Sequence, residues 1–136
     1  MEIKSKTHET VDLVVDTLKR YNIIERCVFT CFDAEILKYI WQTYKLKCQG
    51  FPKELLQNIE DGEADTYSFL YSVGISLKYL TKELVDFFTI KNILIWPYCV
   101  NDEEWALRTI ELGGTLVTCD DPAPALKVFR EKGYHK

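Results

Sequence analysis

Short runs of β-prone residues alternate with stretches of helical periodicity along this chain, and no other feature restricts the fold as strongly. Apolar residues at helical spacing, such as Val11, Val15 and Leu18, indicate the helices. Strands that alternate with helices in this way are typical of parallel βαβ units. The sequence therefore predicts an α/β fold with mostly parallel strands, at 1–4, 27–31, 46–49, 68–76, 92–96 and 116–119.

Residues with short polar side chains precede most of the periodic stretches, as expected of helix N-caps. Asp121 is followed by Pro122, which suits the first position of a helix, and Gly133 is a suitable stop. Asn101 lies three residues before Glu104, which predicts a variant of the capping box. The predicted N-caps are Thr7, Asp33, Thr81, Asn101 and Asp121.

The chain has 136 residues, 47% of them hydrophobic, and this size suits one domain over 1–136. Its formal net charge is -4, and its 17 basic residues are spread along the chain. That distribution argues against nucleic acid or an acidic membrane as a partner, and favours a small molecule or another protein. Apolar stretches such as 93–96 are far shorter than the roughly 20 residues of a membrane span.

The five cysteines are odd in number and show no C-x-x-C spacing, unlike the disulfide framework of a small secreted protein. We therefore expect a reducing, cytoplasmic environment. Four of them fall near the ends of predicted strands, where a cluster for a soft metal is conceivable and small buried thiols are more usual. These four are Cys31, Cys48, Cys99 and Cys119.

Four segments together carry a resemblance to one known family. Glu2–Lys4 is similar to that family's Glu-x-Lys strand end, and Thr30–Asp33 lies where the family has Ser-Phe-Asp. Trp96–Asp102 resembles the family's Trp-Thr-Val-Asn-Asp segment with extra residues interposed. Gly113–Pro122 is similar to the closing Gly-Val-Asp-Gly-Ile-Ile-Thr-Asp-x-Pro strand. Each motif alone is weak, but their order and spacing agree over nearly the whole chain, and the family they resemble is the glycerophosphodiester phosphodiesterases.

The resemblance implies a TIM-type barrel, which closes eight strands in roughly 250 residues and carries its chemistry at the carboxyl ends of the strands. This chain would supply about six of the eight βα units, and so a partial barrel. The implied activity, from lipid metabolism, is hydrolysis of glycerophosphodiesters to glycerol 3-phosphate and an alcohol. The family uses a divalent metal, calcium or magnesium, and a pair of histidines for proton transfer.

Carried over residue by residue, the resemblance implies four site residues. Glu2 matches a carboxylate metal ligand, and Lys4 matches a catalytic lysine near the phosphate. Trp96 and Phe32 match residues that line the substrate pocket. Each has an ordinary alternative, which is a solvated chain terminus for Glu2 and Lys4 and core packing for the two aromatic residues.

The sequence also departs from the family. The His-Arg-Gly, Glu-x-Asp and His-Asp motifs do not occur, and His8 and His135 lie outside any such context. We therefore expect the chain alone to be nearly inactive. The alternative is a non-catalytic binding or assembly module derived from the barrel. An unrelated nucleotide-binding domain is disfavoured, since no Gly-rich phosphate loop follows a predicted strand.

A barrel that lacks strands exposes two sheet edges and part of its apolar interior. Three outcomes are open: the chain is a fragment of a longer enzyme, two copies cover each other's edges, or the sheet rearranges. We expect a fragment or a homo-oligomer in preference to a stable monomer.

Overall fold

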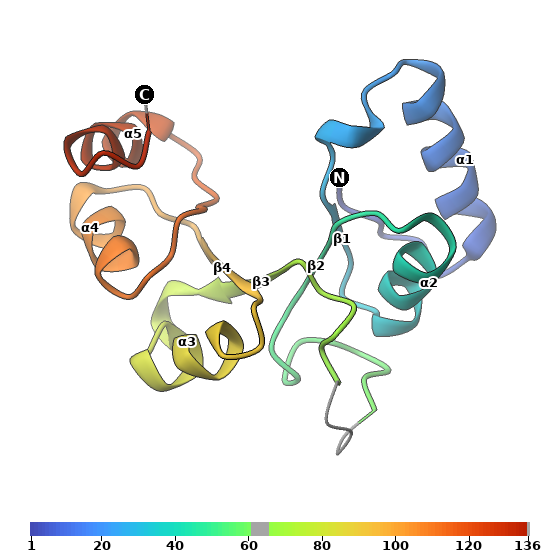
Figure 1. Cartoon of the computed structure of the whole chain (residues 1–136), viewed down its shortest axis with the longest axis horizontal. Coiled ribbons are helices and arrows are strands. Elements are labelled where there is room, and N and C mark those ends of the chain that lie inside the picture. Colours follow the sequence, from blue (N-terminus) through green and yellow to red (C-terminus); the bar gives the residue numbers. More distant parts are fainter. Residues whose placement is uncertain (61–65, 136) are drawn as a thin grey trace. The chain divides into compact units, whose positions relative to one another are not determined.

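The computed structural model describes residues 1–60 and 66–135. The chain divides into two compact units, Met1–Tyr71 and Ser72–Lys136, and each is described by itself (Figure 1). Both consist of parallel strands and helices, which confirms the predicted α/β class. The single domain over 1–136 stays a prediction. No helix within the described residues is long and apolar enough to cross a membrane.

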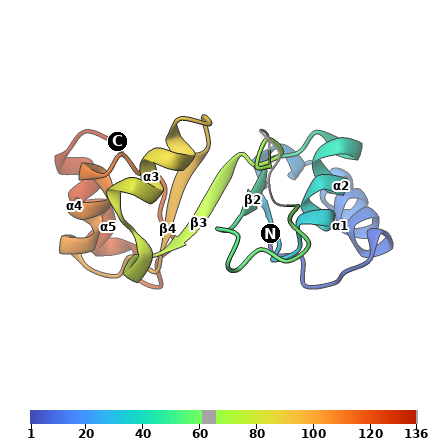
Figure 2. The same ribbon diagram turned by 90° about the horizontal axis from the view of Figure 1, so that it is seen from below.

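The first unit is built around a short parallel pair, in which Phe29 is the partner of Cys48. Glu2 joins the same pair through an isolated parallel bridge to Thr30. Figure 2 shows both long helices of this unit on the same side of β2. Its elements are α1 (His8–Arg20), η1 (Ile24–Arg26), β1 (Phe29–Thr30), α2 (Ala34–Tyr44) and β2 (Cys48–Gly50).

The core of the first unit follows from the helical spacing in the sequence. Val11 and Val15 of α1 are fully buried, as are Leu37 and Ile40 of α2. The Cys48 thiol lies 3.5 Å from the Leu37 carbonyl oxygen, which places this side of β2 against α2. The opposite face of the strands is therefore the one on which Glu2 lies, because alternate strand residues point to opposite faces.

The second unit pairs β3 and β4 in parallel, in register from Ser72 with Leu94 to Ser76 with Tyr98. Tyr98 also forms a parallel bridge to Thr118. A buried cluster of Val100, Ala106, Ala125, Val128 and Phe129 holds the last two helices together. The elements are β3 (Ser72–Ser76), η2 (Leu77–Tyr79), α3 (Lys82–Thr89), β4 (Leu94–Tyr98), α4 (Glu103–Glu111) and α5 (Pro122–Glu131).

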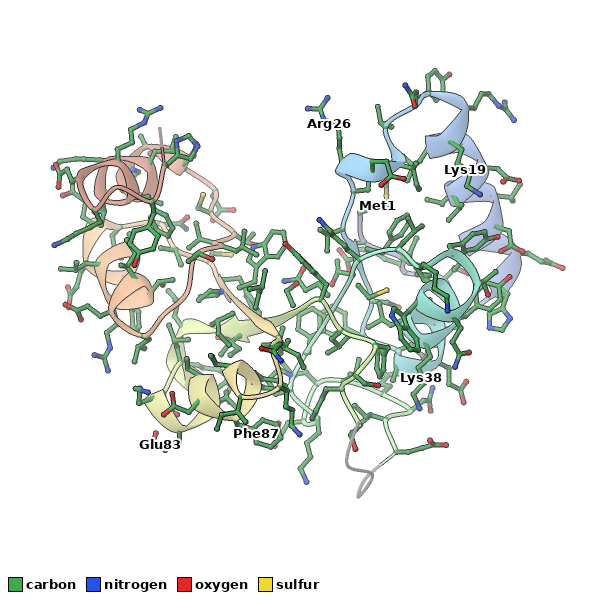
Figure 3. All side chains as sticks on the ribbon, viewed as in Figure 1. Met1, Lys19, Arg26, Lys38, Glu83 and Phe87 are labelled. Carbon is green, nitrogen blue, oxygen red and sulfur yellow. The ribbon has the colours of Figure 1, made fainter. Side chains whose placement is uncertain are left out.

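The end of α4 requires two glycines, one for its backbone conformation and one for close packing. Gly113 has a φ of 94°, a conformation that side chains rarely adopt. A Cβ atom on Gly114 would lie 2.7 Å from Cγ2 of Thr109, a fully buried residue of the same helix. By contrast, Phe87 projects from α3 and is exposed (Figure 3).

Most predicted boundaries are confirmed. Thr7, Asp33, Thr81 and Asp121 each cap a helix with the side chain. The cap predicted at Asn101 is wrong by one residue, because the Asp102 carboxylate accepts from the Trp105 amide at 2.8 Å. The expected strands at 1–4 and 116–119 are each a single bridge, and the strand expected at 68–76 begins only at Ser72.

A buttress of three side chains joins α1 to α2. Oδ1 of Asp12 accepts hydrogen bonds from the hydroxyls of Tyr39 at 2.8 Å and Tyr44 at 2.7 Å. These bonds hold the pKa of Asp12 below its ordinary value, with the Tyr44 bond as the larger cause. The ammonium of Lys19, labelled in Figure 3, lies 5.0 Å from the centre of the Tyr44 ring.

We predict that Asp12→Asn makes the first unit less sensitive to acid. The pKa of Asp12 is lowered in the folded state, so the stabilisation is complete above the unfolded value of about 3.9 and is lost as pH falls through the folded value. Denaturation curves followed by circular dichroism between about pH 6 and pH 3 measure this. The free energy of unfolding should fall less steeply in the variant than in the wild type.

Asp16→Asn is the matched control, since it changes an exposed carboxylate on the same helix. Parallel acid profiles for wild type and Asp12→Asn would contradict the prediction.

Candidate functional site

A small cavity in the first unit brings together three of the residues predicted for the site. It has a volume of about 180 Å³ and opens where the chain leaves β1. Its lining combines the start of the chain, the turn into α2 and one residue of the loop after β2. The lining residues are Glu2, Ile3, Lys4, Lys6, Cys31, Phe32, Asp33 and Gln57.

Backbone pairing fixes the start of the chain against β1. The Ile3 amide donates to the Thr30 carbonyl, and the Thr30 amide donates to the Met1 carbonyl, each at 2.8 Å. Ile3 is buried, with only 4% of its side chain exposed, so its neighbours Glu2 and Lys4 point the other way. The start of the chain is therefore paired and not frayed, whereas the Glu2 and Lys4 side chains are solvated.

Glu2 and Lys4 lie beside each other at the mouth of the cavity. Their closest atoms, Oε2 and Nζ, are 3.8 Å apart, and both side chains are exposed. An ion pair of this length in water is weak, so both groups can be redirected towards a ligand at little cost. The pair offers one cation and one hard oxygen donor.

Phe32 forms one wall of the cavity. Its ring stacks on the buried Phe51 ring, with centroids 4.0 Å apart and planes 4° apart, and 42% of Phe32 is exposed. The stack fixes the orientation of the exposed ring. Phe32 is therefore neither a plain core residue nor a mobile surface side chain, and its free face can contact a ligand.

Asp33 contributes rigidity to the cavity. Its Oδ1 accepts from the Glu35 amide at 3.0 Å, capping α2, and its Oδ2 accepts from the Asn58 side chain at 2.9 Å. Both carboxylate oxygens thus have protein donors in a residue that is 4% exposed. Asp33 serves as a structural carboxylate.

The residues around the cavity do not by themselves fit a calcium or magnesium ion. Calcium requires six to eight oxygen ligands, and Glu2 is the one carboxylate here whose oxygens are not committed to the helix cap. Within residues 1–60 and 66–135, no three histidine, cysteine or acidic side chains gather at distances that suit a metal. Glu2 alone can supply one ligand to a larger set.

Two of the cysteines near the strand ends, Cys31 and Cys48, have poorly reactive thiols. Burial raises the pKa of the Cys31 thiol, which lines the cavity, and that of the Cys48 thiol to about 12. A thiol with a raised pKa is protonated at neutral pH and makes a poor nucleophile or metal ligand. All five cysteines are free.

Trp96 lies in the second unit, in the middle of β4, and is partly buried. Its register partner is Gly74, which has no side chain to cover the indole ring. The indole Nε1 is buried and has no hydrogen-bond partner among the described residues. Whether Trp96 faces the same ligand as Glu2, Lys4 and Phe32 stays a prediction.

Asn101, predicted as a helix cap, instead joins the two motif segments of the second unit. Its Nδ2 donates to Asp120 Oδ2, and its Oδ1 accepts from the Asp120 amide, both at 2.8 Å. Between them, the Val100 amide donates to the Thr118 carbonyl at 2.8 Å. The loops that follow β4 and Thr118 are therefore held side by side.

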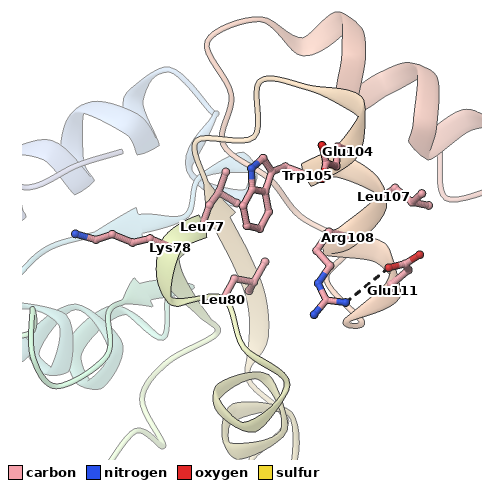
Figure 4. Close-up of a pocket in the computed structure, with 8 residues that line it drawn as sticks. All are labelled: Leu77, Lys78, Leu80, Glu104, Trp105, Leu107, Arg108 and Glu111. Atoms are coloured by element: carbon pink, nitrogen blue, oxygen red, sulfur yellow. Dashed lines mark ion pairs between the residues drawn. The ribbon is translucent and has the colours of Figure 1, made fainter.

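A larger hollow in the second unit contains none of the predicted site residues. It has a volume of about 450 Å³ and lies between η2 and α4, where Trp105 points towards Leu77 and Arg108 lies 3.8 Å from Glu111 (Figure 4). Two basic and two acidic side chains line this hollow, so it carries no net charge. His8 does not line the first-unit cavity, and its ring stacks on the Tyr39 ring with centroids 3.8 Å apart.

The sequence interpretation missed two lining residues, Lys6 and Gln57. Lys6 could have been predicted from the sequence, because Glu2, Lys4 and Lys6 occupy alternate positions and so share one face of an extended segment. Gln57 could not, because its place depends on a long-range bridge to Asp33.

Comparisons with known proteins place the fold. No protein-family model matches the sequence, and no curated protein matches it. Solved structures do match. A Silicibacter pomeroyi protein assigned as a glycerophosphoryl diester phosphodiesterase has a TM-score of 0.77 and 21% identity, and the match covers 98% of this chain and 50% of that protein.

Two further matches belong to the same enzyme class. A glycerophosphodiester phosphodiesterase from Parabacteroides distasonis has a TM-score of 0.73 and 17% identity, over 96% of this chain and 56% of that one. An Oleispira antarctica phosphodiesterase in complex with its product sn-glycerol-3-phosphate has a TM-score of 0.69 and 16% identity, over 90% and 49%. This chain therefore spans about half the length of the structures it matches.

These matches confirm the predicted partial TIM-type barrel. They also show that the chain's structural neighbours are glycerophosphodiester phosphodiesterases, the family that its motifs resemble. At this level of identity the comparison establishes the fold.

We predict that Asn101→Ala loosens the second unit around Asp120. The change removes two hydrogen bonds, one of them to a carboxylate, and should cost about 1 to 3 kcal/mol of local stability. Hydrogen exchange measured by mass spectrometry should show faster exchange in peptides covering 118–121. Thr115→Ala, at an exposed residue of the same stretch, is the control. Equal exchange in the two variants would rule out a role for the pair.

Proposed function

We propose that this chain is the part of a glycerophosphodiester phosphodiesterase barrel that binds the phosphate ester. The supporting observation is the first-unit cavity, where a fixed aromatic wall, an ammonium and a carboxylate meet at the end of β1. The substrate class is a glycerophosphodiester, and the products are glycerol 3-phosphate and an alcohol. The product bound by the Oleispira antarctica neighbour supports this ligand class.

Each cavity residue has a role that its chemistry allows. Lys4 contacts the phosphate oxygens, because its ammonium is exposed and, among the described residues, is held only by a 3.8 Å pair to Glu2. The free face of Phe32 packs against the carbon atoms of the glycerol. Trp96, in the second unit, contacts the substrate in this proposal, as the resemblance implies. Glu2 supplies one oxygen ligand to a divalent cation whose other ligands are not among the residues of this cavity.

Proton transfer is not assigned to this chain. His8 is committed to its stack on Tyr39, and the sequence has no His-Arg-Gly or His-Asp motif. We propose that the 136-residue chain binds the ester and turns it over only when those groups are supplied. We also propose a cytoplasmic location, which its free cysteines support.

The second candidate is a binding or assembly module that keeps the barrel scaffold without catalysis. The full engagement of Asp33 favours it, because the second carboxylate of the cavity stabilises structure instead of awaiting a ligand. The two candidates share the binding of phosphate esters and differ in turnover.

We predict opposite effects of Glu2→Gln on glycerol 3-phosphate binding with and without a divalent cation. Without the cation, the variant should bind more tightly, because a negative charge beside the phosphate is gone. Added calcium or magnesium should raise the affinity of the wild type slightly, because Glu2 supplies only one protein ligand, and should raise that of the variant less, because this ligand is lost. Isothermal titration calorimetry measures both affinities.

Glu25→Gln, at an exposed position of η1, is the matched control. If the cation raised the affinity of Glu2→Gln as much as that of the wild type, Glu2 would not be a metal ligand. Hydrolysis of glycerophosphocholine is followed in the same samples. Turnover by the wild-type chain alone would contradict the assignment of proton transfer to other groups.

We further propose that a second copy of this chain covers the edge formed by its first residues. An apolar groove of about 260 Å³ lies beside that edge. Leu13, which is 70% exposed, and Met1, which is 53% exposed, both line it. Association of two copies would bury these apolar side chains and would pair the backbone groups of the strand edge.

We predict that Leu13→Lys shifts the oligomeric state towards the monomer. Light scattering should give a wild-type mass above 15.9 kDa and a lower mass for the variant. Ile90→Lys, at an 81% exposed residue of the second unit, is the control and should behave as the wild type. A monodisperse wild-type monomer would overturn the association.

A further inference from the structure

Lys6 is a second cation at the cavity. Among the described residues, its ammonium forms no ion pair with the cavity carboxylates Glu2 and Asp33. Lys6 follows Lys4 by two residues and lines the same cavity. Its ammonium donates to Oε1 of Gln57 at 2.7 Å. A neutral amide accepts this bond, so the bond orients the ammonium without neutralising its charge.

Gln57 is held firmly for an exposed loop residue. Its amide donates to the Phe32 carbonyl at 2.8 Å, and its carbonyl accepts from the Ala34 amide at 2.9 Å. These bonds tie its backbone to the turn between β1 and α2, on either side of Asp33. The position of the Gln57 side chain is therefore set by the same turn that positions Phe32.

The bond from Lys6 also decides which way the Gln57 amide is turned. Oε1 is occupied as an acceptor, and the amide nitrogen carries two N–H donors. The rim thus presents donors from Lys4, Lys6 and Gln57. Asp33 keeps its negative charge, but both of its oxygens are bonded to the Glu35 amide and the Asn58 side chain, so neither is a free acceptor facing the ligand. Such a rim suits a ligand rich in anionic oxygens.

We propose that Lys6 and Gln57 form a second anion contact, which makes this cavity prefer a dianionic phosphate monoester to a monoanionic phosphate diester. The inference rests on the proposed function and adds a preference for the product of that reaction. A phosphate monoester carries a charge of about -1.5 to -2 at pH 7, whereas a diester carries one negative charge. The attraction between Lys6 and the ligand is therefore stronger for the monoester, because its phosphate carries more negative charge.

Lys6 is in this view a specificity residue and Lys4 a general phosphate contact. Loss of Lys4 weakens both ligands, because both carry at least one charged phosphate oxygen. Loss of Lys6 weakens the monoester selectively. The ratio of the two affinities is therefore the quantity that separates the roles.

The experiment titrates glycerol 3-phosphate, glycerophosphocholine and inorganic phosphate into the purified chain at about pH 8, without divalent cations, by calorimetry. Lys6→Met should weaken glycerol 3-phosphate about tenfold and glycerophosphocholine by less than about threefold. Lys6→Arg should keep the preference, and Gln57→Leu should lose part of it. Lys132→Met, in the second unit, is the control.

A titration at about pH 5 tests the charge directly, because the second phosphate ionisation lies near pH 6. There the wild-type preference for the monoester should shrink towards that of Lys6→Met at pH 8. Inorganic phosphate that binds as tightly as glycerol 3-phosphate would show that the glycerol contributes nothing, which contradicts the wall assigned to Phe32 but not the anion contact.

The outcomes separate the two proposals. If the wild type binds both esters and Lys6→Met leaves their ratio unchanged, the inference about Lys6 is overturned and the proposed function stands. If the wild type binds neither ester, both are overturned. Circular dichroism of each variant establishes that the fold is intact, and Lys6→Arg guards against a purely structural effect of the Lys6 to Gln57 bond.

Discussion

The candidate site depends on two backbone hydrogen bonds that join residues 1–3 to Thr30. They convert the start of the chain from a free end into a paired segment. Once Ile3 is buried on one face, the alternation of an extended chain places Glu2, Lys4 and Lys6 on the other. The aromatic wall and the rim follow from the next turn of the chain, where Asp33 caps α2 and Gln57 bonds to the backbone on both sides of it.

Much of the fold could be predicted because its signals are local. N-caps at Thr7, Asp33, Thr81 and Asp121 need only a short polar side chain before an apolar periodic stretch. The parallel α/β class follows from alternation, which is also local. The partial barrel was predicted from four motifs and is confirmed by solved structures at 13–21% identity.

The remaining errors concern contacts between distant segments. Asn101 and Asp102 are both good caps, and the sequence alone cannot say that Asn101 is committed to Asp120, 19 residues away. The expected strands at 1–4 and 116–119 have suitable residues but form one bridge each, because strand length depends on how neighbours twist past one another. Gln57 is placed by a bridge to Asp33 that no local pattern encodes.

The two hydrogen bonds between Asn101 and Asp120 couple the residue types that these positions can accept. The amide offers one donor and one acceptor, and its partner offers a carboxylate and a main-chain N–H. A carboxylate at 101 would face the carboxylate at 120, whereas an apolar residue at 120 would still leave the main-chain bond to Asn101. The residues accepted at 101 in related chains should thus depend on the residue at 120.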